Sequence, residues 1–89
     1  MIESKVEIVN RLGLHARAAA KLVHTAGAFA SNVTLMKDGD EVDAKSILGL
    51  LQLGAPKGSF VFVRCDGNDE SAAMEAVSQL IADRFGEEE

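Results

Sequence analysis

The segment Phe60-Val61-Phe62-Val63-Arg64-Cys65 has the strongest strand signal in the chain. Its residues are mostly aromatic or β-branched, types that are enriched in strands, and the turn-forming stretches 54–58 and 66–68 lie on either side of it. We expect so apolar a run at the centre of a sheet. Cys65 is then a small hydrophobe of the core, while Arg64 points to the opposite face of the strand.

Three other segments have the pattern of strands with one buried face. Residues 2–9 alternate between apolar and charged side chains, and residues 32–37 read as a second strand. Asp38-Gly39 follows with the residues that a tight hairpin turn prefers, so residues 41–43 are the expected return strand. The buried faces are predicted to hold Ile2, Val6, Ile8, Val33 and Leu35.

Three segments have helical patterns. Residues 16–26 carry apolar side chains at helical spacing, and Gly27 is the expected stop. Residues 47–53 form a short helix, and a last helix begins after Asn68 or Asp69, either of which can cap it. The buried positions are predicted to include Ala16, Ala19, Ala20, Val23 and Ala26 of the first helix and Ala73, Val77, Leu80 and Ile81 of the last. Gly86 and Glu87–Glu89 are predicted to form a flexible, solvated tail.

The predicted order is strand, helix, strand, strand, helix, strand, helix (βαββαβα), which indicates a single α+β domain over residues 1–89. With 89 residues, 47% of them hydrophobic, the chain has material for one small core. One connection is a hairpin and two can be crossovers, so we expect helices on one face of a mostly antiparallel sheet. The other face is expected to meet water.

The composition excludes several classes of partner. A net charge of −5 opposes binding to nucleic acid or to an anionic membrane, because both need a basic field. No apolar stretch approaches the ~20 residues that span a bilayer, and no basic, apolar leader is present, so we expect a protein of the cytoplasm with no membrane insertion. We also expect a monomer. His24 and Cys65 offer too few ligands for a metal, and no cofactor is expected.

His15 lies at the predicted start of the first helix, after Gly13-Leu14. The first N–H groups of a helix have no intrahelical acceptor, and the helix dipole places positive charge there, so this end stabilises an anion. A neutral imidazole at this position can accept a phosphoryl group. Arg17 adds a guanidinium for phosphate oxygens, and the backbone N–H groups of Ala16 and Arg17 can face the same anion. These residues alone also fit a histidine that only caps the helix or lies on the surface.

Ser46 and the apolar residues after it form a second motif. Ser46 stands where a helix needs an N-cap. The helix that follows has too many apolar residues for one buried stripe, so some of them face solvent and indicate a docking surface. We expect Ile47, Leu48 and Leu51 to form this docking patch.

Together the two motifs resemble one family. Gly13-Leu14-His15-Ala16-Arg17 and Lys45-Ser46-Ile47-Leu48-Gly49-Leu50-Leu51, with the element order, are similar to the histidine-containing phosphocarrier (HPr) family of the bacterial phosphoenolpyruvate:sugar phosphotransferase system (PTS). The resemblance implies an open-faced β-sandwich with a four-stranded antiparallel sheet and three helices. It also implies that phospho-enzyme I phosphorylates Nδ1 of His15, that Arg17 assists, and that the group passes to an enzyme IIA domain. Such a protein is a carrier and no stand-alone enzyme.

Ala18 and Ser46 also bear on the function that the resemblance implies. Ala18 departs from the proline of the family; alanine is a good helix former, so the helix should still begin, but the loop geometry and the choice of partner stay open. The resemblance makes Ser46 a target of HPr kinase/phosphorylase, besides its role as a cap. Two other functions also stay open: an HPr paralogue in a nitrogen-related or regulatory phosphorelay, and a small α+β interaction module in which His15 is incidental.

Overall fold

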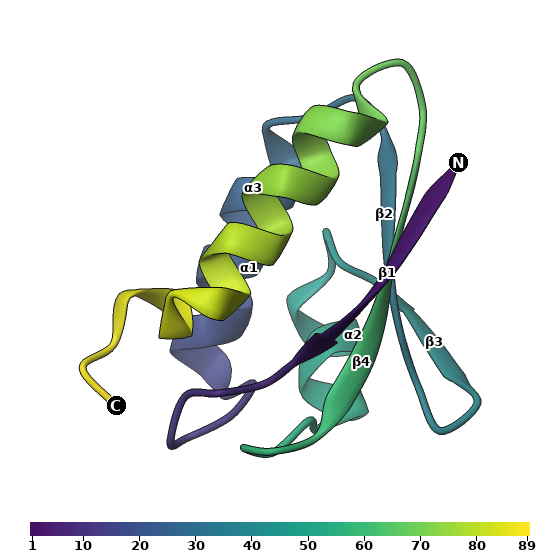
Figure 1. Cartoon of the computed structure of the whole chain (residues 1–89). Helices are drawn as coiled ribbons and strands as arrows, with labels where there is room; N and C mark the ends of the chain where they lie inside the picture. The colour runs from purple at the N-terminus through teal and green to yellow at the C-terminus, as the bar shows by residue number, and fades with distance from the viewer.

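A four-stranded antiparallel sheet forms one layer of the molecule, and the helices cover one of its faces (Figure 1). The computed structural model describes residues 1–89. The predicted α+β order is confirmed. None of the helices has the length and hydropathy that a membrane span requires. The elements are β1 Ile2–Glu7, α1 Ala16–Gly27, β2 Asn32–Lys37, β3 Asp40–Asp43, α2 Ile47–Leu53, β4 Phe60–Asp66, α3 Glu70–Ala82 and the 3-10 turn η1 Arg84–Gly86.

The central place predicted for β4 is confirmed. The sheet has the order β1-β4-β2-β3, and β4 pairs with β1 so that Ile2 lies opposite Cys65. The predicted hairpin between β2 and β3 is also confirmed. Asp38 and Gly39 have φ angles of 52° and 87°, the left-handed values that a type I′ hairpin turn requires at both central positions.

The two faces of β4 differ sharply in exposure. Cys65 is fully buried, and burial raises the pKa of its thiol, as expected for an unreactive core cysteine. On the open face, Phe60 and Phe62 are 50% and 43% exposed, and Lys5 Nζ lies 4.7 Å from the centroid of the Phe60 ring. The sequence placed Arg64 on this face, but it did not predict that Phe60 and Phe62 are exposed, because aromatic side chains in an apolar run are typical of buried positions.

One hydrophobic cluster joins the helices to the sheet. α1 buries Leu22 together with small residues, whereas Ala16 and Ala20, which we expected on its buried face, are exposed. Alanines on several sides of a helix carry little directional signal, because each buries little apolar area. The buried cluster consists of Ile8, Leu14, Ala18, Ala19, Leu22, Ala26, Val33, Leu35, Ala44, Leu50, Leu53, Ala55, Val61, Val63, Cys65, Ala73, Val77, Ile81 and Phe85.

Some boundaries differ from the sequence predictions. β1 ends at Glu7 rather than at residue 9, and β3 and β4 each gain one residue, at Asp40 and Asp66. Gly27 does not stop α1 but is its last helical residue. Ala28 closes the helix with a right-handed backbone, donating its N–H to the Thr25 carbonyl at 3.3 Å.

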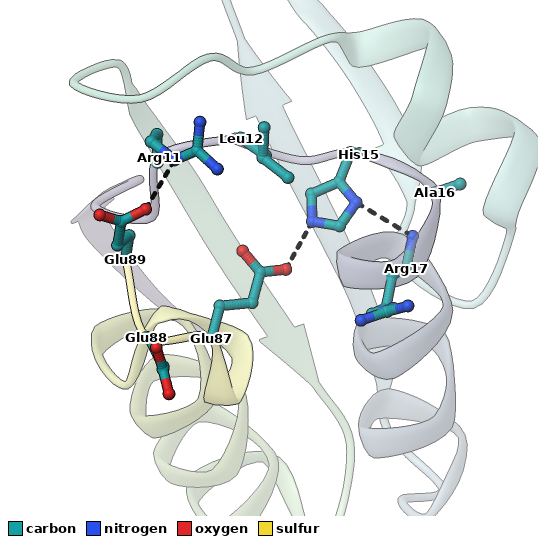
Figure 2. A pocket seen from close by; sticks show the side chains of 8 residues that line it. All are labelled: Arg11, Leu12, His15, Ala16, Arg17, Glu87, Glu88 and Glu89. Carbon is teal, nitrogen blue, oxygen red and sulfur yellow. Dashed lines mark hydrogen bonds and ion pairs between the residues drawn. The ribbon is translucent and has the colours of Figure 1, made fainter.

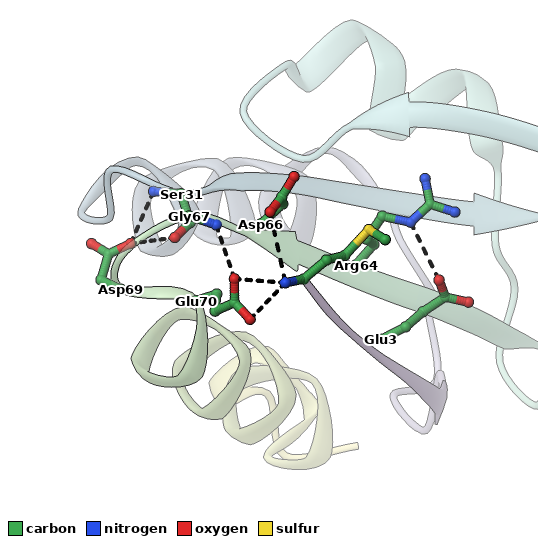
Figure 3. A network of polar contacts seen from close by, with 8 residues as sticks. Glu3, Ser31, Arg64, Asp66, Gly67, Asp69 and Glu70 are labelled. Carbon is green, nitrogen blue, oxygen red and sulfur yellow. Dashed lines mark hydrogen bonds and ion pairs between the residues drawn. The ribbon is translucent and has the colours of Figure 1, made fainter.

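Asp69 precedes α3 as the cap position, but its side chain does not cap the helix. Its carboxylate accepts the backbone N–H and the hydroxyl of Ser31, the first at 2.9 Å (Figure 3). It also accepts the backbone N–H of Ala30 at 2.9 Å. The hydroxyl bond and the backbone bonds hold the pKa of Asp69 below its usual range. In the same network Glu70 pairs with the Met1 amino group at 2.8 Å. These contacts tie the start of α3 to the loop before β2 and to the N-terminus.

Candidate functional site

The loop before α1 is fixed against the segment that follows α2. The Leu14 N–H donates to the Ala55 carbonyl at 2.8 Å, and Gly13 adopts a φ of +67°. A Cβ at Gly13 would lie 2.6 Å from the Ala55 oxygen and 2.9 Å from Cα of Pro56, so there is no room for a side chain. This close approach places the next residue but one, His15, at the start of α1.

His15 is the N-cap residue of α1, with an extended backbone. Its Nδ1 accepts the backbone N–H of Arg17 at 3.3 Å, a long hydrogen bond. The first intrahelical bond runs from the Ala19 N–H to the His15 carbonyl, so the N–H groups of Ala16 and Ala18 have no intrahelical acceptor. The capping role considered from the sequence is therefore confirmed, and Nδ1 faces the positive end of the helix.

The other ring nitrogen of His15 faces the C-terminal segment (Figure 2). Nε2 lies 2.5 Å from Oε2 of Glu87, and the other oxygen of this carboxylate accepts the Asn10 side-chain N–H at 3.0 Å. Burial acts to raise the pKa of Glu87, but the hydrogen bonds from Asn10 and His15 outweigh it and hold the pKa below its usual range. We expected a solvated tail here; the structure instead holds Glu87 against the imidazole.

An open pocket of about 580 Å³ surrounds this pair of side chains. The guanidinium of Arg17 lies at its edge, exposed and without a carboxylate partner, whereas Arg11 forms an ion pair with Glu89 at 2.9 Å. Arg17 is therefore the cation that remains available to an incoming anion. The lining residues are Arg11, Leu12, His15, Ala16, Arg17, Glu87, Glu88 and Glu89.

α2 packs on α1 and carries the second motif. The predicted cap is confirmed, because the Ser46 hydroxyl accepts the Gly49 N–H at 3.2 Å. The exposure of the docking patch is also confirmed: Ile47, Leu48 and Leu51 are 42%, 74% and 39% exposed. The patch and the His15 loop thus belong to elements that pack against each other.

His24 lies in the last turn of α1, at the opposite end of the helix from His15, and is exposed. The structure contains no group of three or more His, Cys, Asp or Glu side chains arranged to hold a metal ion. His24 takes no part in the pocket around His15.

Known proteins match the chain over its whole length. The family model described as "PTS HPr component phosphorylation site" matches residues 2–83. The chain belongs to the HPr family. It is 52% identical to the phosphocarrier protein HPr of Cupriavidus necator over 89 residues, covering 100% of both chains. It is 51% identical to the HPr of Xylella fastidiosa strain Temecula1 over 88 residues, covering 99% of both.

A solved structure agrees with this membership. The crystal structure of HPr from Thermoanaerobacter tengcongensis has a TM-score of 0.96 and 45% identity, and the match covers 100% of both chains. The resemblance to the HPr family and the HPr-like fold are thereby confirmed. The chain is a phosphocarrier of the PTS, which shuttles a phosphoryl group and is not itself an enzyme. A general interaction module in which His15 is incidental does not fit this result.

The departure from the HPr sequence pattern at Ala18 is explained locally. Ala18 is the third residue of α1 and is fully buried, and its N–H has no intrahelical acceptor. A proline at this position would therefore sacrifice no helical hydrogen bond, and alanine needs no compensating contact. The helix begins at Ala16 despite the substitution, as predicted.

Sequence reasoning missed Glu87 and its partner Asn10. A run of glutamates after a glycine has the composition of a solvated tail, and nothing in it distinguishes Glu87 from Glu88 or Glu89. The one signal was Phe85, a large apolar residue just after the last amphipathic segment. It is fully buried and pulls the end of the chain back onto α1.

Proposed function

We propose that this phosphocarrier accepts a phosphoryl group on Nδ1 of His15 from phospho-enzyme I and passes it to an enzyme IIA domain in sugar uptake. One observation supports this more than any other: Nδ1 faces the first N–H groups of α1 while its only partner is the long 3.3 Å bond from Arg17. A nucleophilic nitrogen needs such an available lone pair, and the arriving oxygens need such donors.

The backbone of Arg17 has a defined part in this proposal. In the free protein its N–H donates to Nδ1. When the Nδ1–P bond forms, the lone pair is used, and the same N–H turns to a phosphoryl oxygen together with the unpaired N–H of Ala16. The Arg17 guanidinium adds a bidentate donor for the remaining charge.

The test is incubation of the purified chain with phosphoenolpyruvate and enzyme I. We expect an acid-labile, base-stable phosphoryl group on the wild type, none on His15→Ala, and full labelling on His24→Ala, which changes the exposed histidine at the far end of α1. Labelling that persists in His15→Ala would refute the assignment. Transfer from the labelled chain to a sugar-specific enzyme IIA, compared with a nitrogen-type one, tests the relay.

The docking patch is proposed as the surface that meets both partners. Leu48, at 74% exposure, is its most exposed member, while Phe60, at 50%, lies on the opposite, open face of the sheet. Leu48→Asp is expected to raise the KM for phosphorylation by enzyme I severalfold, and Phe60→Asp, the matched control, to leave it unchanged. Equal effects of the two variants would contradict the location of the patch.

Ser46 is proposed as a regulatory phosphorylation site for HPr kinase/phosphorylase. Its hydroxyl lies at the start of α2, directly before the docking patch, so a phosphate there would place negative charge beside Ile47. Ser46→Asp is expected to accept phosphoryl groups from enzyme I more slowly than the wild type. Unchanged kinetics would remove this proposal.

A further inference from the structure

Burial and the Asn10 side chain hold His15 and Glu87 in short contact. The imidazole side chain is 27% exposed and that of Glu87 is 18% exposed, so both are largely removed from water. The Asn10 side chain, which is fully buried, gives one N–H to the Gly13 carbonyl at 2.8 Å and another to Glu87 at 3.0 Å. The amide therefore connects the carboxylate directly to the loop that positions His15.

The end of the chain is shaped to reach this site. Arg84, Phe85 and Gly86 have φ angles of 56°, 54° and 76°, a left-handed turn that reverses the chain after α3. Two consecutive non-glycine residues in this conformation are costly, and the turn is held by the buried Phe85 ring and by Lys21, whose Nζ donates to the Phe85 carbonyl at 2.6 Å. Glu87 is the first side chain after this turn.

The hydrogen bonds assign the proton on the imidazole. Nδ1 accepts a backbone N–H, so this nitrogen is not protonated. In the neutral ring the proton is then on Nε2, which donates it to the Glu87 carboxylate. A carboxylate that receives one imidazole N–H fixes both the tautomer and the ring orientation, leaving the other nitrogen as the base or nucleophile.

We propose that Glu87 is a positioning residue for phosphoryl transfer, which holds the Nε2–H tautomer of His15 and stabilises the cationic ring of the phosphorylated state. This inference rests on the proposed function of His15. In the acceptance step the Nδ1 lone pair forms the N–P bond while the bond from phosphorus to the donor breaks, and its electron pair stays with the donor. Nε2 keeps its proton, so the ring becomes an imidazolium.

The position of Glu87 fits this step. The carboxylate lies at Nε2, on the opposite side of the ring from Nδ1 and from the N–H groups that would hold the phosphoryl oxygens. It therefore faces the positive charge that develops on the ring and not the incoming anion. When the phosphoryl group leaves, the N–P electron pair returns to Nδ1 and the neutral Nε2–H tautomer is restored.

The neighbouring carboxylates provide an internal control. Glu89 pairs with Arg11, and Glu88 is exposed with no hydrogen bond or ion pair. Glu88→Gln removes the same charge from the same segment without touching His15. The charged groups around the ring are Arg11 in the preceding loop, Arg17 and Lys21 on α1, and Glu87, Glu88 and Glu89 in the C-terminal segment.

The first test compares Glu87→Ala, Glu87→Gln and Glu88→Gln by ¹⁵N NMR of the imidazole. The wild type, Glu88→Gln and Glu87→Gln are expected to show the Nε2–H tautomer, because a glutamine carbonyl still accepts the N–H. Glu87→Ala is expected to show a mixture of tautomers, because only the long 3.3 Å bond from the Arg17 N–H then favours the proton on Nε2. If Glu87→Ala keeps the wild-type ¹⁵N pattern, the carboxylate does not hold the tautomer and the proposal fails.

The second test measures phosphorylation by enzyme I and the pH profile of phosphohistidine hydrolysis in the same variants. Glu87→Ala is expected to accept the phosphoryl group about tenfold more slowly, as for loss of a charge-assisted hydrogen bond. Both Glu87 variants should shift the hydrolysis profile to lower pH, and Glu88→Gln should not. If the Glu87 variants change the melting temperature but leave the pH profile of hydrolysis unmoved, the role of Glu87 is purely structural and the proposal is overturned. If the wild type itself is not labelled at His15, the proposed function fails instead.

Discussion

Gly13→Ala tests whether the close backbone approach at the His15 loop holds the site together. Two costs combine at this position. An L-residue at a φ of +67° lowers the folding stability by about 1–2 kcal/mol relative to glycine. The new Cβ, 2.6 Å from the Ala55 oxygen, also forces a backbone shift like that of an overpacked core, which costs about 1–3 kcal/mol. We expect the variant to be less stable than the wild type by about 2–5 kcal/mol.

The matched control for Gly13→Ala is Gly39→Ala in the β2–β3 hairpin. Gly39 has a φ of +87°, but a Cβ there would meet nothing within 4 Å. This variant should lose only the conformational cost of about 1–2 kcal/mol. The difference between the two variants therefore isolates the clash with Ala55 and Pro56.

Urea unfolding at equilibrium measures both variants. With an m-value of about 1 kcal/mol/M, the midpoint of Gly13→Ala should lie about 1 M or more below that of Gly39→Ala. The Leu14–Ala55 hydrogen bond must also stretch, so phosphorylation by enzyme I should slow in Gly13→Ala alone. Equal urea midpoints for the two variants would refute the steric reasoning.

Three further predictions concern the helix ends and the acid network. Ser46→Ala should lower the stability by about 1 kcal/mol through loss of the cap on α2, whereas Ser46→Asp should retain the wild-type stability, because aspartate also caps helices. A urea midpoint for Ser46→Ala at the wild-type value would exclude a capping role. Gly27→Ala should raise the melting temperature, since the site is helical and open and alanine gains up to about 1 kcal/mol over glycine; a lower melting temperature would contradict the helical assignment. The pKa of Asp69 is held below its usual 3.8. The ionised carboxylate therefore contributes fully to the stability of the folded protein above that pH, and this contribution is lost as the pH falls through the lowered pKa. Asp69→Asn should therefore be less stable than the wild type at neutral pH and should lose less stability on acidification. Parallel curves of stability against pH for the variant and the wild type would count against this linkage.

The fold was largely predictable because its strands carry clear local patterns. The alternation over residues 2–9, the Asp38-Gly39 turn and the apolar run from Phe60 each specify one feature of the sheet, and the structure has all three. The exposed apolar residues of α2 were equally predictable, since seven residues cannot bury so many side chains on one face. Local pattern is sufficient where a residue's role depends on its immediate neighbours in sequence.

The parts that were not predictable depend on distant partners. Asp69 had the residue type of a helix cap, yet its carboxylate bonds Ser31, which lies far away in sequence. Glu87 was indistinguishable from its neighbouring glutamates, and only the turn around Phe85 selects it to meet His15. No periodicity or propensity encodes such contacts, because they arise only after the elements have packed.

The pairing of β1 with β4 has a consequence for how the chain assembles. The first strand of the sheet finds its only neighbour near the other end of the sequence, with Ile2 opposite Cys65. During synthesis β1 thus remains an unpaired edge until β4 has emerged, while the β2–β3 hairpin can already close. The native sheet should accordingly form late in synthesis and in one cooperative step. Its rate should be limited by closure of the long chain segment between β1 and β4 rather than by formation of the individual helices.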